Sequence, residues 1–217
     1  MIYMMNTKSF IKIFSHEDPK HIEKTQFVVV SKRIRKTVED DNVIFCSKLF
    51  PSDMLLADYR TEFEEGYFEK EYRKYLDKNK LTLAIILKGV IEEKYTVVFL
   101  STLKEWKVGF MQILSKYIFD EFGYPVIDYK KYKVGNKLPA SVKNFDDRSV
   151  LDRCNEVIKE EELSRKKRLM KTKEGRYELV TSMSKDEMKE QLKKMNLYSA
   201  GLDKHTMKEL LIEFFVN

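Results

Sequence analysis

The spacing of apolar residues predicts strands and helices that alternate along the chain. Short apolar or β-branched runs predict strands, whereas apolar residues that recur every three or four positions predict amphipathic helices. Strands are predicted at 27–30, 95–100 and 125–129. The run at 43–46 could be another strand or an extended connection. Helices are predicted at 59–79, 81–93 and 107–122. A strand, a helix and a strand in 95–129 predict a parallel pair with a crossover. The fold class is therefore α/β, with a small parallel-sheet, Rossmann-like domain.

Local signals mark two helix ends in this domain. Ser52 or Asp53, which follow Pro51, could cap a helix, because short polar side chains accept hydrogen bonds from the first free amides. Gly123 follows the predicted helix 107–122 and is a typical helix stop.

The second half of the chain is more polar. Residues 130–148 predict a linker, and the stretch from Ser149 to about Met170 predicts a charged helix whose thin apolar face suits a connector. Ser184 and Glu187 match a capping box, followed by an extended loop from 196 to 206 and a second amphipathic helix. Three parts are predicted: an α/β domain at 1–132, a basic linker and charged helix at 133–178, and a helical hairpin at 179–217.

The positive charge is concentrated in one segment. The chain has a formal net charge of +6, and residues 129–176 hold fifteen Lys or Arg against eight Asp or Glu. Such clustering is typical of proteins that contact the phosphate backbone of nucleic acids. A solvated helix face is the alternative.

Cysteine content and hydropathy indicate the compartment. Cys46 and Cys154 are the only cysteines, and each is expected to be a buried small hydrophobe. The first fifteen residues lack the apolar core of a signal peptide, and no stretch reaches the length of a membrane span. We therefore expect a cytoplasmic protein without a membrane partner. The Lys-, Ile- and Tyr-rich composition hints at a viral or phage source, in which case the location would be the host cytoplasm.

Motifs for cofactors and metals are not evident. The seven glycines do not match a phosphate-binding loop. His16, Glu17, Asp18 and His21 are the only clustered metal-capable residues, and Pro19 among them favours a solvated turn. No cofactor and no metal are therefore expected. Tyr129, Tyr132 and Tyr177 could stack on bases, while the other tyrosines are expected to pack in the core.

The order of features in 11–132 resembles the family named domain of unknown function 488. The matching stretches are Val28–Ser31, Tyr67–Arg73, Val97–Ser101 and Phe122–Tyr129. The resemblance implies a Cys just after the strand 95–100 and a Cys-His-Arg helix start. This sequence has Ser101 and then Gly109, Phe110 and Met111, which lack a nucleophile, a base and an anion clamp. A degenerate pocket on a binding scaffold is therefore expected, and the missing groups disfavour an enzyme.

The C-terminal pattern resembles the SAP and LEM helix-extension-helix modules, although its loop looks longer than SAP spacing. SAP-type modules generally bind DNA, and LEM-type modules can bind protein. Cations that could meet phosphates are Lys189, Lys193, Lys194, Lys204, His205 and Lys208, and in the charged helix Arg165, Lys166, Lys167 and Arg168.

These features give three hypotheses. The first is a non-catalytic accessory protein that binds DNA or another nucleic acid. The second is a protein-interaction module that docks on a larger nucleic-acid machine. The third is an enzyme that acts on nucleotides or nucleic acid with catalytic groups outside the degenerate pocket.

Overall fold

The computed structural model describes residues 2–6, 25–30, 43–61, 66–101, 109–128 and 146–216. The chain divides into two compact units, 1–158 and 159–217. The boundary between them lies inside the charged helix, whereas the sequence suggests divisions at 132 and 178.

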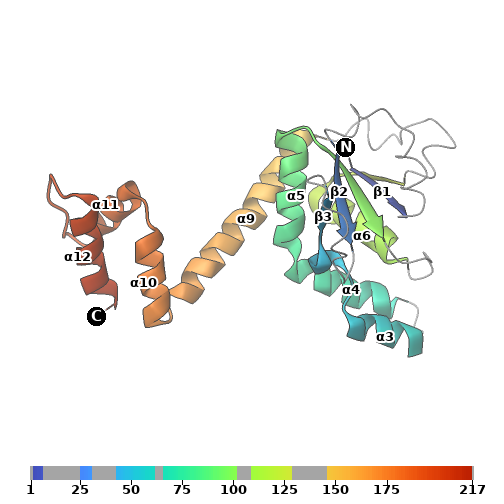
Figure 1. Cartoon of the computed structure of the whole chain (residues 1–217), viewed down its shortest axis with the longest axis horizontal. Helices are drawn as coiled ribbons and strands as arrows, with labels where there is room; N and C mark the ends of the chain where they lie inside the picture. The colour runs from blue at the N-terminus through green and yellow to red at the C-terminus, as the bar shows by residue number, and fades with distance from the viewer. Residues whose placement is uncertain are drawn as a thin grey trace. The chain divides into compact units, whose positions relative to one another are not determined.

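The N-terminal unit contains an open parallel sheet (Figure 1). Its strands are β1 (Ile2–Asn6), β2 (Thr25–Val30), β3 (Val43–Phe45), β4 (Thr96–Ser101) and β5 (Val126–Asp128), in the order β3-β2-β4-β1-β5. All four neighbouring pairs are parallel, so the predicted α/β class is confirmed.

Strand β1 was not predicted from the sequence, and it changes the pairing. Ile2 is in register with Val97 of β4 on one side and with Val126 of β5 on the other. The prediction that β4 and β5 form a hydrogen-bonded pair is therefore wrong, because β1 lies between them. Buried β4 is the middle strand, which suits its β-branched run.

Four helices of this unit follow the predicted order, with one correction. They are α3 (Asp53–Thr61), α4 (Tyr67–Lys78), α5 (Lys80–Glu92) and α6 (Phe110–Phe122), preceded by the short helix η1 (Ser47–Leu49). The predicted helix 59–79 is wrong as a single element: α3 ends at Thr61, and α4 starts after Gly66, whose φ is +88°. Ser52 caps α3, because its Oγ accepts from the Leu55 amide at 3.2 Å. Gly123 ends α6 with a φ of +75°, as predicted.

The main core forms between one face of the sheet and these helices (Figure 1). Alternate strand residues such as Met4, Val28 and Phe99 face α4, α5 and α6, as the two-residue period of a strand requires. The opposite face carries a second buried cluster of Phe27, Val29, Val98 and Leu100. Burial of both faces explains why these strands read as continuous apolar runs.

The charged helix α9 (Asp147–Leu169) begins in the N-terminal unit. Val150 and Cys154 are 2% and 0% exposed and belong to the main core, whereas Leu163 farther along is 54% exposed. The prediction that this helix is a connector rather than part of a core is therefore wrong for its first half, which packs in the main core.

The C-terminal unit adds three helices, α10 (Lys173–Ser182), α11 (Lys185–Lys194) and α12 (Lys204–Val216). Helix α10 was not predicted, yet it contributes Val180 to a core that also holds Met188, Leu192, Met207 and Leu211. The predicted loop 196–206 is too long, because α12 already begins at Lys204. Asp203 favours that start, since its Oδ1 accepts from the Thr206 amide at 2.7 Å.

Among the helices of the described ranges, none has both the length and the apolar character that a membrane span requires.

Candidate nucleic-acid interface

Helix α11 presents a row of lysines. Its start is fixed by the predicted capping box: Ser184 Oγ accepts from the Glu187 amide at 3.2 Å, and a Glu187 carboxylate oxygen accepts from the Ser184 amide at 2.8 Å. From there, exposed Lys185, Lys189 and Lys193 recur every four residues, so they lie along one face. We call these three residues the lysine stripe.

The C-terminus of α11 turns the chain back beside the stripe. Asn196 has a φ of +58° and donates to the Lys193 carbonyl at 3.1 Å, and Leu197 donates to the Leu192 carbonyl at 2.9 Å. These two bonds form a Schellman motif with Asn in the left-handed position. The motif fixes where Leu197 and then Tyr198 leave the helix.

Tyr198 lies next to two members of the stripe. The Nζ atoms of Lys189 and Lys193 each lie 5.5 Å from the centre of its ring. One such cation–π contact contributes about 0.5–1 kcal/mol at an exposed site. The half-buried ring also packs against the core of the unit.

The stripe differs from neighbouring cations in its partners. Lys194 Nζ lies 2.8 Å from Glu190, and His205 lies 3.5 Å from Glu209. The bond from Lys194 holds the pKa of Glu190 below its usual value. Within the described part of the chain, no carboxylate lies within 4.0 Å of a stripe ammonium.

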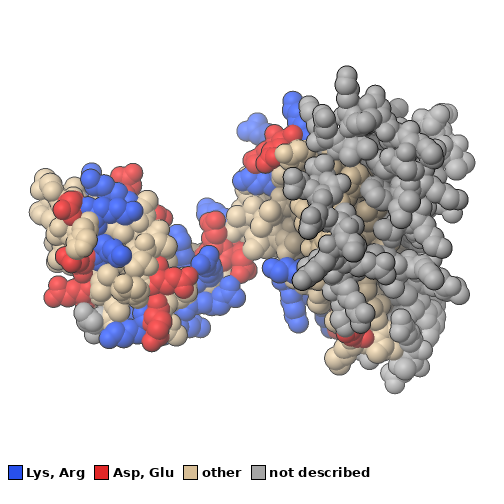
Figure 2. All heavy atoms as spheres, viewed as in Figure 1, with Lys and Arg blue, Asp and Glu red and all other residues tan. Residues whose placement is uncertain are grey.

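The basic run of α9, Arg165 to Arg168, is largely paired. Arg165 lies 3.0 Å from Glu178, Lys166 4.0 Å from Glu187 and Arg168 2.6 Å from Glu161. Lys167 is exposed and is the member of the run without an ion pair to a described residue. Figure 2 shows the result: basic and acidic side chains are interspersed over the C-terminal unit.

Two further predicted cations lie on α12. Lys204 is exposed in the first turn, and Lys208 is half-buried one turn later. Neither forms an ion pair with a described residue.

A groove of about 580 Å³ lies between α10, α11 and the part of α9 after residue 158. Leu169, Leu179 and Met183 supply its apolar lining, while Arg165 and Lys166 accompany Glu187 and Glu190. Because both signs of charge line it, this groove does not favour a polyanion.

Ser101, which was predicted to belong to a degenerate pocket, lies at the carboxyl edge of the sheet. Ser101 ends β4 opposite Asn6 of β1, and the chain leaves these adjacent strands towards opposite edges of the sheet. Open α/β sheets place ligands at such a switch point.

Gly109, with a φ of +60°, precedes α6, and Phe110 and Met111 are 4% and 2% exposed. The Phe110 ring packs edge-on against Phe50 and Tyr72, so it belongs to the core.

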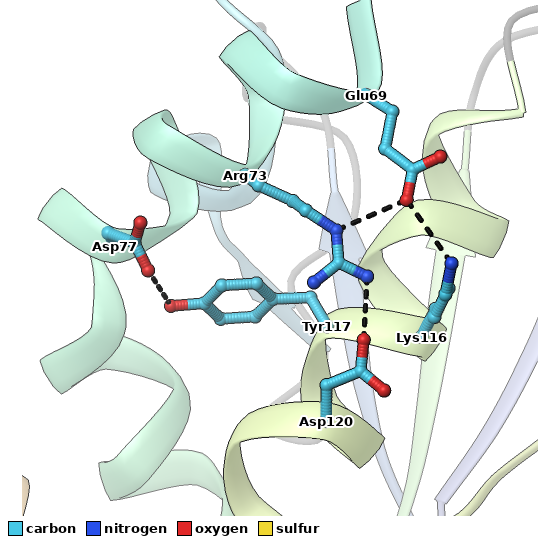
Figure 3. A network of polar contacts seen from close by, with 6 residues as sticks. All are labelled: Glu69, Arg73, Asp77, Lys116, Tyr117 and Asp120. Carbon is cyan, nitrogen blue, oxygen red and sulfur yellow. Dashed lines mark hydrogen bonds and ion pairs between the residues drawn. The ribbon is translucent and has the colours of Figure 1, made fainter. Parts of the chain in front are cut away.

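A polar network fixes α6 to α4 (Figure 3). Arg73 donates to Asp120 at 2.7 Å and to Glu69 at 3.2 Å, and Lys116 lies 3.5 Å from Glu69. The buried Tyr117 hydroxyl donates to Asp77 at 2.7 Å, and burial together with this bond raises the Tyr117 pKa. Every charge in the network has a partner, which suits a structural role.

The other predicted groups divide between described and undescribed residues. Tyr129, Tyr132 and the His16–His21 segment lie outside the described residues, and Tyr177 is 49% exposed on α10. Across the ranges that the structure describes, no three His, Cys, Asp or Glu side chains gather as a metal site would require.

Comparison with models of known families, with curated proteins and with solved structures found no match to this chain.

Two residues of the interface were not predicted. Lys185 carries the same four-residue spacing as Lys189 and Lys193, so the helical period of the sequence could have identified it. Tyr198 was assigned to the core with most other tyrosines. Its place beside the stripe depends on the Schellman turn, and the sequence signal for that turn is Asn196 after the last lysine.

Proposed function

We propose that this protein is a non-catalytic accessory protein that binds nucleic acid through its C-terminal unit. The lysine stripe carries the proposal, because its three ammonium groups point from one helix face without carboxylate partners among the described residues. The net charge alone does not show which unit would bind nucleic acid. Residues 159–217 hold fourteen Lys or Arg and eleven Asp or Glu, the same +3 excess as the rest of the chain.

Phosphate contacts explain how such a stripe would bind. Each ammonium that approaches a phosphate releases a condensed counterion, and this release drives association at low salt. A lysine already paired with a carboxylate must first give up that partner. The stripe therefore offers more binding free energy per residue than Lys194 or the α9 run, and so do Lys204 and Lys208.

The non-catalytic part of the proposal rests on the N-terminal unit. Gly109, Phe110 and Met111 stand where the resemblance implies Cys, His and Arg, and the two side chains are buried in the core. These positions supply no nucleophile, base or anion clamp.

The test is binding of the full chain to DNA across a salt series. We expect affinity to fall as salt rises. Changing Lys185, Lys189 and Lys193 together to Gln should lower affinity about tenfold or more at low salt and reduce the slope of log affinity against log salt by about 2.

Lys194→Gln is the matched control, because it removes a cation of the same helix that already has a partner. It should change affinity less than about twofold. Absence of binding at low salt, affinity independent of salt, or equal losses in the control and the triple variant would contradict the proposal.

A further inference from the structure

We infer that the site takes unpaired rather than duplex nucleic acid, with one base stacked on Tyr198 and flanking phosphates held by Lys189 and Lys193. This inference rests on the proposed function and adds the class of ligand. It comes from the combination of one aromatic ring and two ammonium groups at the same place.

The geometry meets both needs of a single strand. Both ammonium groups lie over the ring, 5.5 Å from its centre. A base that stacks on the ring would therefore replace these cation–π contacts, and its own backbone would lie within reach of both cations. Lys185 continues the stripe, which spans roughly 12 Å at the helical rise per residue. Proteins that bind single strands combine such a positive track with aromatic rings on which bases stack.

The ring is held in place before any ligand arrives. The Schellman motif fixes the backbone at Asn196 and Leu197, and the core contacts of Tyr198 support the ring. Leu197, 42% exposed beside it, adds apolar surface next to the ring. A fixed ring loses little conformational entropy on binding, which favours affinity.

A duplex would not use this arrangement. Its bases already stack on one another inside the helix, and its outward groups are phosphates and sugars. Lysines alone would serve a duplex, and the aromatic ring among them would contribute little. An unpaired base has a free face that can stack on an aromatic side chain.

The experiment measures fluorescence anisotropy of the full chain with labelled oligonucleotides of about 12 nucleotides, within the range that small modules cover. The probes are an oligo-deoxythymidine strand, a duplex of equal length, and a strand of abasic deoxyribose phosphates. Tyr198→Leu keeps apolar packing and removes the ring, whereas Tyr198→Phe keeps the ring.

We expect the single strand to bind more tightly than the duplex. Tyr198→Leu should weaken the single strand about tenfold and leave the duplex and the abasic strand within about twofold, while Tyr198→Phe should bind like the parent. Duplex binding as tight as single-strand binding, or an equal loss on all three probes, would overturn this inference alone. Failure of every probe to bind would overturn the proposed function with it.

Discussion

The basic run of α9 and the lysine stripe of α11 contain similar numbers of cations but differ in what surrounds them. Three of the four residues in the run lie within 4.0 Å of a glutamate. The stripe has an aromatic ring as neighbour instead. In the sequence the run is the more conspicuous feature, because its four cations are consecutive.

The difference teaches that a cation is available to bind phosphate when no carboxylate lies next to it. The density of positive charge along the sequence does not decide this. Glu187 shows how closely the two regions are related. It completes the capping box of α11 and lies 4.0 Å from Lys166 of the run. The same residue therefore stabilises the helix that presents the stripe and partly neutralises the run.

The largest effect on this comparison is expected from Gly175, at the corner between α9 and α10. A Cβ at this position would lie 2.3 Å from the Leu169 carbonyl oxygen and 2.8 Å from Thr172 Oγ1. Gly175→Ala must therefore separate the two helix ends, at a cost of about 2 kcal/mol. Faster hydrogen exchange of α10 and α12 amides should report the loss. Because the pair of Arg165 with Glu178 spans this corner, the run should then contribute more to nucleic-acid binding.

Gly89→Ala is the matched control, since nothing lies within 4 Å of a Cβ there and the residue is inside α5. It should leave exchange in α10 unchanged. Equal exchange in Gly175→Ala and the parent would show that the corner accommodates a methyl group.

A smaller effect is expected from removing the run itself. Changing Arg165, Lys166, Lys167 and Arg168 together to Gln should weaken binding by about threefold or less, because three of these cations already have partners. The loss should be equal for all base sequences, since phosphate contacts carry no base information. Parallel salt titrations of this variant and the stripe variant provide the measurement. A loss larger than that of the stripe would reverse the comparison.

The smallest effect is expected from acid. Bonds from the Ser184 and Thr206 amides lower the pKa values of Glu187 and Asp203, and the bond from Lys194 lowers that of Glu190. A carboxylate whose pKa is lowered by folding stabilises the fold at a pH above its ordinary pKa of roughly 4. This stabilisation is lost as the pH falls below that value and through the lowered pKa. Thermal unfolding followed by circular dichroism should show the decline.

Glu187→Gln should make that decline less steep, because one of the three carboxylates no longer titrates. Glu213→Gln is the matched control, because it changes a carboxylate of α12 that neither caps a helix nor pairs with a described cation. Identical acid profiles for parent and Glu187→Gln would show that the charge of Glu187 does not contribute, since Gln can still complete a capping box.

The sequence predicts most of the fold where apolar periodicity is strong. Helices α5 and α6, strand β4 and the capping box of α11 all agree with their patterns. Strand β1 was missed because its residues, Ile-Tyr-Met-Met-Asn, lack a β-branched run, and its identity as a strand depends on pairing with β4 and β5. Helix α10 was missed because Gly175 disfavours a helix near its start. The burial of Gly175 and Val180 stabilises the helix only in the folded unit.

The candidate site was predictable in composition but not in detail. The lysines of α11 are visible in the sequence, whereas the pairing of Arg165 with Glu178, thirteen residues away, requires the turn between α9 and α10. Tyr198 was expected in the core, and its half-buried ring does pack against the core of the unit. Only the left-handed Asn196 brings it back to Lys189, because a continuing helix would carry it away from that side chain.

The burial of both thiols has a practical consequence for labelling chemistry. Cys154 is 0% exposed and burial raises its pKa to about 11, and burial also raises the pKa of Cys46, which is 8% exposed. At neutral pH both sulfurs stay protonated and shielded from maleimides. A cysteine introduced at exposed Ser199 would therefore be the reactive one, and a fluorophore there would sit one residue from Tyr198 without removal of either native thiol.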